Sequence, residues 1–196
     1  AAIEKGCSYA VIDEKEYADP GDSRFILVDD TLIAYKELAR QHRRQFQIPV
    51  IGITGTNGKT TSKELISAVL SEKFKVWHTE GNFNNDVGVG LNADHEIAVI
   101  EMGASHQGDI EKLVNYVEPT CGLITNVGRA HLQGFGSFEG VKRTKGELYD
   151  YLKAHGCLLF LNESNPDLSE MASQREFDRI ISYGQDDTAN VQGEVV

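Results

Sequence analysis

Short apolar runs alternate with amphipathic stretches through most of the chain, which is the pattern of strands and helices that follow one another in an α/β fold. The apolar runs predict strands at Val50–Thr54, Lys75–His78, Ile97–Glu101, Gly122–Asn126 and Cys157–Leu161. The stretches between them predict helices at Thr60–Lys73, Asp109–Tyr116 and Phe138–Ala154. This alternation implies a mostly parallel sheet flanked by helices, whose ligands bind at the C-terminal ends of the strands.

The first 47 residues follow a different pattern. Two short β-like runs, Tyr9–Ile12 and Phe25–Val28, precede a helix predicted from Thr31 to about Phe46. Apolar residues recur at helical spacing on this helix, at Leu32, Tyr35, Leu38 and Ala39. We therefore expect residues 1–47 to be the tail of a small α/β domain, and residues 48–196 to form a second domain.

A basic cluster closes this first predicted helix, and its members are Arg40, His42, Arg43 and Arg44. Such a cluster could bind phosphate. Because cations at a helix C-terminus complement the helix dipole, a solvated last turn is the favoured interpretation.

Residues 52–61 read GITGTNGKTT between a predicted strand and a predicted helix. In such a loop, glycines let consecutive backbone N–H groups face a polyphosphate, and the helix N-terminus adds positive potential. Lys59 would supply charge, and Thr60 would offer a hydroxyl to Mg²⁺. The general pattern asks for glycine where this chain has Ile53, so a plain Gly-Asn turn is an alternative for the G-K-T triplet alone. The flanking strand and helix favour a phosphate loop, and with it a nucleoside triphosphate.

Further polar residues follow predicted strands at the same edge of the sheet. Glu101 ends an apolar run and could hold Mg²⁺ near the phosphates, or could cap the strand or pair with a lysine. His131 could contact metal or phosphate, although a lone loop histidine is usually a surface residue. The amide-rich stretch 81–86 could hydrogen-bond a sugar, a phosphate or a carboxylate, or could be a plain Asx-turn loop.

Lys145 is the most informative residue of the last predicted helix. Val141, Leu148 and Leu152 lie at helical spacing around it, so its side chain should emerge on the core-facing stripe. Burial lowers the pKa of a lysine and leaves a neutral amine that can act as a base, form a Schiff base or take up CO₂ as a carbamate. The alternative is a lysine that reaches past its apolar neighbours to solvent.

Composition narrows the classes of function. The chain has 196 residues, of which 40% are hydrophobic, so it is long and apolar enough to form a core. No run approaches the ~18 apolar residues that span a bilayer, so we expect no membrane partner and a cytoplasmic location. The formal net charge of -11 disfavours general nucleic-acid binding, which needs a basic field. An anionic nucleotide would then depend on local positive groups and metal.

Taken together, these residues resemble the Mur ligase family, the ATP-dependent amide-forming enzymes of peptidoglycan precursor synthesis. The motifs that carry the resemblance are Thr54-Gly55-Thr56-Asn57-Gly58-Lys59-Thr60-Thr61, Gly81-Asn82-Phe83-Asn84-Asn85, Glu101-Met102-Gly103-Ala104, Thr125-Asn126-Val127-Gly128, Ala130-His131-Leu132, Gly134-Phe135-Gly136-Ser137 and Thr144-Lys145-Gly146-Glu147. The resemblance spans about residues 25–161 and accounts for the glycine spacing of the phosphate loop. The later motifs resemble the branch that adds D-alanyl-D-alanine.

The resemblance implies a role for each candidate residue. The loop that holds ATP would comprise Gly55, Thr56, Asn57, Gly58, Lys59, Thr60 and Thr61. One Mg²⁺ would bind Thr60 and Glu101, and a second would bind His131 and a carbamylated Lys145. Lys59, Lys145 and His131 would be the catalytic residues. The amides that face the phosphates or the UDP-linked substrate would be Asn82, Asn84 and Asn85.

The implied reaction is phosphorylation of UDP-N-acetylmuramoyl-tripeptide by ATP, followed by attack of D-alanyl-D-alanine on the acyl phosphate. The resemblance also implies that residues 1–47 end a UDP-substrate-binding domain, and that residues 48–196 are a central ATP-binding domain that is incomplete at its C-terminal end. We expect a monomer, and this piece alone could be inactive. The alternatives are an amino-acid-adding or folylpolyglutamate synthase-like ligase, and a nucleotide-binding module without chemistry of its own.

Overall fold

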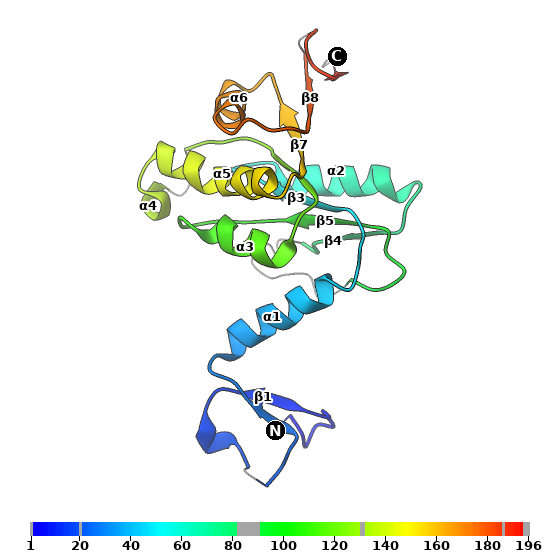
Figure 1. Cartoon of the computed structure of the whole chain (residues 1–196), viewed down its shortest axis with the longest axis vertical. Coiled ribbons are helices and arrows are strands. Elements are labelled where there is room, and N and C mark those ends of the chain that lie inside the picture. The colour runs from blue at the N-terminus through cyan, green and yellow to red at the C-terminus, as the bar shows by residue number, and fades with distance from the viewer. Residues whose placement is uncertain (1, 20, 82–90, 130–131, 186, 194–196) are drawn as a thin grey trace.

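A parallel sheet forms the centre of the molecule (Figure 1). The computed structural model describes residues 2–19, 21–81, 91–129, 132–185 and 187–193, and within these ranges the sheet has seven strands in the order β4-β5-β3-β6-β7-β8-β9. The strands are β3 (Val50–Thr54), β4 (Val76–His78), β5 (Ile97–Glu101), β6 (Cys121–Ile124), β7 (Leu158–Asn162), β8 (Ile180–Gly184) and β9 (Val191–Gln192). All six neighbouring pairs are parallel, which confirms the predicted α/β class.

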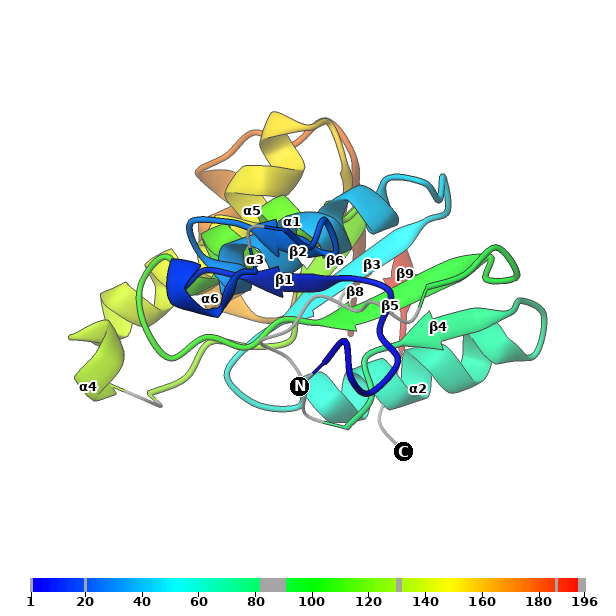
Figure 2. The same cartoon turned by 90° about the horizontal axis from the view of Figure 1, so that it is seen from below.

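Helices cover both faces of this sheet (Figure 2). The helix α2 (Lys59–Ser71) packs Ile66 and Leu70 against a small cluster on one face, and α3 (Asp109–Val117) and α5 (Phe138–Ala154) lie on the other. Two short helices, α4 (Leu132–Phe135) and α6 (Pro166–Ser173), were not predicted. None of the helices in the described ranges combines the length and the apolar character needed to cross a membrane.

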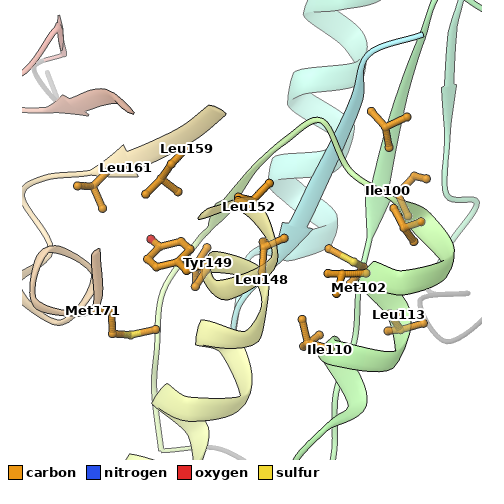
Figure 3. Packing of buried hydrophobic residues seen from close by; sticks show 14 of the residues in the cluster. Ile100, Met102, Ile110, Leu113, Leu148, Tyr149, Leu152, Leu159, Leu161 and Met171 are labelled. Atoms are coloured by element: carbon orange, nitrogen blue, oxygen red, sulfur yellow. The ribbon is translucent and has the colours of Figure 1, made fainter. Parts of the chain in front are cut away.

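The larger core lies between the sheet and the helices α3, α5 and α6 (Figure 3). Met102, which follows β5, lies among the side chains of α3 and α5, and Leu148 of α5 faces it. Tyr149 lies on the side of α5 that faces β7 and α6, and its ring meets the Phe177 ring edge-on at 5.8 Å. Because Met102, Leu148 and Tyr149 are completely buried, this packing fixes the position of α5 against the C-terminal end of β5.

The N-terminal residues form a small unit at one end of the molecule (Figure 1). Its elements are the parallel pair β1 (Ala10–Ile12) and β2 (Phe25–Leu27), the 3-10 helix η1 (Lys15–Tyr17), and α1 (Thr31–Arg43), which leads to the central sheet. The side chain of Asp30 caps α1 through the Ile33 N–H. Of the apolar residues at helical spacing on α1, Ala39 is buried, whereas Leu38 is 65% exposed.

One member of the basic cluster at the end of α1, Arg43, is not solvated in this structure. Arg43 is only 7% exposed, and its guanidinium donates to the carbonyl oxygens of Val117, Glu118 and Phe46. Its neighbour Arg44 pairs with the Glu118 carboxylate at 2.6 Å. The favoured interpretation was therefore wrong for Arg43, because the turn that follows α3 supplies carbonyl partners that replace water. These contacts attach α1 to the central unit.

Candidate functional site

The phosphate-loop motif lies between β3 and α2, as predicted. The strand is β-branched and almost entirely buried, and the chain then turns at Gly58, which has a φ of 76° and is the N-cap of α2. No side chain caps this helix, so the first N–H groups of α2 are positioned to bind an anion. Lys59 follows at once, and its Nζ donates to the carbonyl oxygens of Gly55 and Thr56 at 3.0 and 3.3 Å.

A second segment, which follows β6, holds this loop in shape. The side-chain amide of Asn126 accepts from the Asn57 N–H at 3.0 Å and donates to the Asn57 carbonyl oxygen at 2.9 Å. The Asn126 carbonyl oxygen accepts from Thr56 N–H at 3.0 Å, and the Thr56 hydroxyl accepts from Gly128 N–H at 2.9 Å. The loop is therefore preorganised by contacts with residues that lie about seventy positions further along the chain.

Gly55 allows the close approach of these two segments. Its φ is +148°, and a Cβ atom at this position would lie 2.0 Å from the Thr125 hydroxyl oxygen. The same hydroxyl donates to the Asn57 carbonyl oxygen at 2.6 Å. Only glycine fits between β3 and the segment that holds the loop.

Thr60 and Glu101 meet at the N-terminus of α2. The Thr60 hydroxyl donates to Glu101 Oε2 at 2.9 Å, and Glu101 is 3% exposed at the end of β5. A hydroxyl and a carboxylate beside a phosphate loop are the hard oxygen donors that Mg²⁺ prefers, so the residues fit this ion. Among the described residues no group of three or more His, Cys, Asp and Glu side chains is arranged to hold a metal. Mg²⁺ commonly combines one or two such protein ligands with phosphate oxygens and water.

Lys145 is buried, as the helical spacing predicted. It is 3% exposed on α5, and its ammonium lies 5.6 Å from the centre of the Phe135 ring. Burial, and to a smaller extent the positive charge of Lys59, lowers the pKa of the Lys145 amine from 10.5 to about 8. The carboxylates of Glu147 and Asp109 act in the opposite direction. The alternative of a lysine that reaches solvent is excluded.

Glu147 joins the helix that carries Lys145 to the start of α3. Its carboxylate accepts from the backbone N–H groups of Gly108 and Glu111, both at 2.8 Å, and so satisfies the beginning of α3. Burial raises the pKa of the Glu147 carboxyl. Because α3 follows the loop after β5, this contact links the position of Lys145 to the strand that ends in Glu101.

Several predicted site residues lie outside the described residues, namely His131, Asn82, Asn84 and Asn85. Their roles stay predictions. The structure brings together Lys59, Thr60, Glu101 and Lys145, from the phosphate loop, β5 and α5. Sequence reasoning assigned no role to Asn126 beyond its motif, and none to Lys63 or Thr79. Asn126 ends a predicted strand at the ligand edge, which is a signal that could have found it, whereas Thr79 and Lys63 carried none.

Comparison with known proteins decides the family. Residues 53–196 match the Mur ligase middle domain. The chain belongs to the Mur ligase family. A Mur ligase of Bacillus subtilis, UDP-N-acetylmuramoyl-tripeptide--D-alanyl-D-alanine ligase, is 40% identical over 167 residues, which cover 83% of this chain and 36% of that protein. The chain thus spans about a third of the length of this curated relative.

Solved Mur ligase structures share the fold. A crystal structure of MurF from Acinetobacter baumannii matches with a TM-score of 0.84 and 32% identity, over 97% of this chain and 42% of that one. A second structure, MurF ligase from Thermotoga maritima in complex with ADP, matches with a TM-score of 0.82 and 30% identity, over 94% and 43% of the two chains. Both matches include the N-terminal unit as well as the central sheet of this chain.

Proposed function

We propose that this chain is the nucleotide-binding part of an ATP-dependent ligase that joins D-alanyl-D-alanine to UDP-N-acetylmuramoyl-tripeptide in peptidoglycan precursor synthesis. The contact between Thr60 and Glu101 at the phosphate loop carries the proposal, because it places a hydroxyl and a carboxylate where a nucleotide-bound Mg²⁺ would need them. The name of the Bacillus subtilis relative and the ADP in the Thermotoga maritima structure support the substrates.

The reaction consists of two displacements. The γ-phosphoryl group of ATP passes to an oxygen of the tripeptide carboxylate, which forms an acyl phosphate and releases ADP. The amine of D-alanyl-D-alanine then attacks the acyl carbon, the C–O bond to phosphate breaks, and inorganic phosphate leaves with an amide formed. No side-chain nucleophile is needed, so catalysis depends on positioning and on neutralising charge.

The residues of this chain supply that positioning. The N–H groups at the start of α2 bind the phosphates, and the Lys59 ammonium leaves its loop carbonyls to neutralise the charge that develops during transfer. Thr60 and Glu101 would hold Mg²⁺, which, when bound, supplies Lewis-acid stabilisation of the phosphate oxygens. The loop residues that would surround ATP are Gly55, Thr56, Asn57, Gly58, Lys59, Thr60 and Thr61.

We place a second Mg²⁺ at a carbamylated Lys145 with the help of His131. The depressed pKa of Lys145 supports this assignment, because a neutral amine can add to CO₂, with an N–C bond formed and one proton released. We assign the binding of the UDP-linked substrate to Asn82, Asn84 and Asn85. We also propose a domain boundary near residue 47, as the resemblance to Mur ligases implies, together with a cytoplasmic location and a monomeric state.

The first test is the binding of ATP by this chain with and without Mg²⁺, followed by calorimetry. We expect Mg²⁺ to tighten binding, Lys59→Met to abolish it, and Lys73→Met, which removes an exposed lysine just beyond α2, to leave it unchanged. Binding that is absent in the unaltered chain, or unaffected by Lys59→Met, would refute the nucleotide site.

The second test measures the ligase reaction. A chimera in which this chain replaces the matching part of the Bacillus subtilis relative is supplied with ATP, the UDP-linked tripeptide and a panel of acceptors: D-alanyl-D-alanine, single amino acids and glutamate with a folate. Mass analysis should show the D-alanyl-D-alanine product and one phosphate released for each amide. Product with another acceptor would favour an amino-acid-adding or folylpolyglutamate synthase-like ligase, and ATP binding with no phosphate release would favour a binding module.

A further inference from the structure

Lys63 is a completely buried lysine that the proposed reaction does not use. It lies on α2, three residues after Thr60, and its side chain is 0% exposed. Its ammonium donates to the carbonyl oxygens of Thr79 and Gly81 at 2.5 and 3.0 Å, and it pairs with Glu64 Oε1 at 3.0 Å. An ammonium has three donors, and these partners satisfy all three.

Thr79 connects this lysine to the candidate metal site. It follows β4 directly, it is 4% exposed, and its N–H donates to the Val99 carbonyl oxygen at 3.1 Å. Its hydroxyl oxygen accepts from the backbone N–H of Glu101 at 3.1 Å. The contacts therefore connect α2 to Glu101 in two ways. The Thr60 hydroxyl bonds to the Glu101 carboxylate, and Lys63 reaches the backbone N–H of Glu101 through Thr79.

Stability alone does not account for a charge in this position. Burying an ammonium is costly, and a buried ion pair can often be replaced by well-packed apolar side chains of similar volume without loss of stability. Lys63 instead holds two carbonyl oxygens at the exit of β4, beside the strand that ends in Glu101. A methionine would fill the same space but would leave the exit of β4 unattached to α2.

We propose that Lys63 is a positioning residue that acts through Thr79 to hold the Glu101 carboxylate against the Thr60 hydroxyl, at the spacing that binds a divalent cation together with a nucleotide. The proposal rests on the nucleotide and Mg²⁺ site proposed above. Lys63 touches neither nucleotide nor metal, so its removal should impair the contribution of Mg²⁺ to nucleotide affinity and spare the affinity for the nucleotide alone.

The experiment measures the affinity of this chain for ATP with Mg²⁺ and with EDTA, and takes the ratio as the gain due to the metal. Lys63→Met removes the three donors, and Thr79→Val removes the hydroxyl at nearly constant volume. Each should reduce the metal gain roughly tenfold, as the loss of one well-formed buried hydrogen bond would. Thr79→Ser keeps the hydroxyl and should keep the gain, and Glu64→Gln, which alters only the exposed partner, should do the same.

A double variant tests the route. If Lys63 acts through Thr79, the pair Lys63→Met and Thr79→Val should lose no more metal gain than the larger single loss, since contacts in one network are not additive. Additive losses would overturn the route, and a full metal gain in Lys63→Met with only a lower melting temperature would reduce Lys63 to a structural tie. If Lys63→Met fails to fold, an undiminished gain in Thr79→Val overturns the proposal. Failure of the unaltered chain to bind ATP with Mg²⁺ would instead sink the proposed function itself.

Discussion

Replacing Lys145 by methionine should stabilise the folded chain at neutral pH. The folded state binds the Lys145 proton with a pKa of about 8, whereas the ordinary pKa of a lysine is 10.5. At about 1.4 kcal/mol for each pH unit, the burial of the charged amine costs about 3 kcal/mol, and Lys145→Met removes this cost. The amine is 3% exposed, so solvent screening reduces the value little.

The pH dependence identifies the cause. Between pH 8 and 10.5 the unfolded chain keeps the Lys145 proton and the folded chain loses it, so the free energy of unfolding of the parent rises with pH. The cost is fully present below pH 8 and disappears above 10.5. The difference in unfolding free energy between variant and parent should therefore be constant below pH 8 and then fall by about 1.4 kcal/mol for each pH unit.

The assay is urea unfolding in CO₂-free buffer with EDTA, at a series of pH values from neutral to about 9.5. This window includes the folded-state pKa of Lys145, about 8, and stays below its ordinary pKa of 10.5. The control is Lys142→Met, on the same helix. The Asp167 and Glu170 carboxylates raise the pKa of Lys142, so this group is protonated in both the folded and the unfolded state through the window. The difference in unfolding free energy between Lys142→Met and the parent should therefore not change with pH. If the unfolding free energies of Lys145→Met and the parent change in parallel with pH, the proposed cost of burying the Lys145 charge is refuted.

Carbon dioxide provides an independent readout of the same amine. At about pH 7.5 roughly a quarter of amines with a pKa near 8 are neutral, against about one in a thousand at the ordinary value. The α-amino group, whose ordinary pKa is also about 8, should give a carbamate carbon signal in every sample. Addition of ¹³C-bicarbonate should produce a second carbamate signal in the folded parent that is missing in Lys145→Met and in the urea-unfolded parent. A second signal of equal size in the variant would assign the uptake to another amine.

Three further substitutions test other parts of the structure. Arg43→Met should destabilise the chain in urea by about 2–3 kcal/mol, because it orphans buried carbonyl oxygens, while the half-exposed Arg44→Met should cost less than about 1 kcal/mol; equal losses would contradict the anchoring role of the buried arginine. Gly55→Ala places a Cβ 2.0 Å from a hydroxyl oxygen at a φ of +148° and should abolish ATP binding, whereas Gly193→Ala points into open space and should be silent in the same calorimetric titration. Asn126→Ala removes both side-chain bonds to the phosphate loop and should weaken ATP binding roughly tenfold, so that an unchanged Kd would exclude preorganisation by this amide.

The parts of the fold that were predicted well are those with a strong period. The strands β3 and β5 and the helix α5 have the predicted bounds, because apolar residues recur at strand or helix spacing along each of them. The helix α6 was not predicted, since eight residues give too little periodicity, although Asn165 and Pro166 mark its start by a capping side chain and a fixed φ. A buried strand can be recognised from a run of about five residues, whereas a helical period needs a longer segment than α6 provides.

Features of the candidate site and its surroundings also fall into two groups, those that local spacing predicts and those that depend on contacts between distant segments. The burial of Lys145 was predictable, because local helical spacing decides which face of α5 a residue occupies. The anchoring of Arg43 was not, because its partners are carbonyl oxygens from a turn 74 positions away, and a carbonyl carries no signature of residue type. The contact of Asn126 with the phosphate loop, 69 positions away, is also a product of the fold. Neither distance nor orientation between two strand ends can be deduced from the pattern of either strand alone.

The charges around the site explain how a chain of net charge -11 can be adapted to a polyphosphate. The positive groups are local: the uncapped N-terminus of α2, Lys59, and an amine at position 145 whose pKa that lysine helps to depress. Burial, together with the repulsion between this amine and Lys59, keeps an appreciable fraction of the Lys145 amine neutral and able to react near neutral pH. Addition of CO₂ would replace a cation by an anionic carbamate, so that the repulsion with Lys59 becomes attraction and oxygen donors are added at this position. The burial that makes a lysine costly at this position is therefore the same property that would make it useful there.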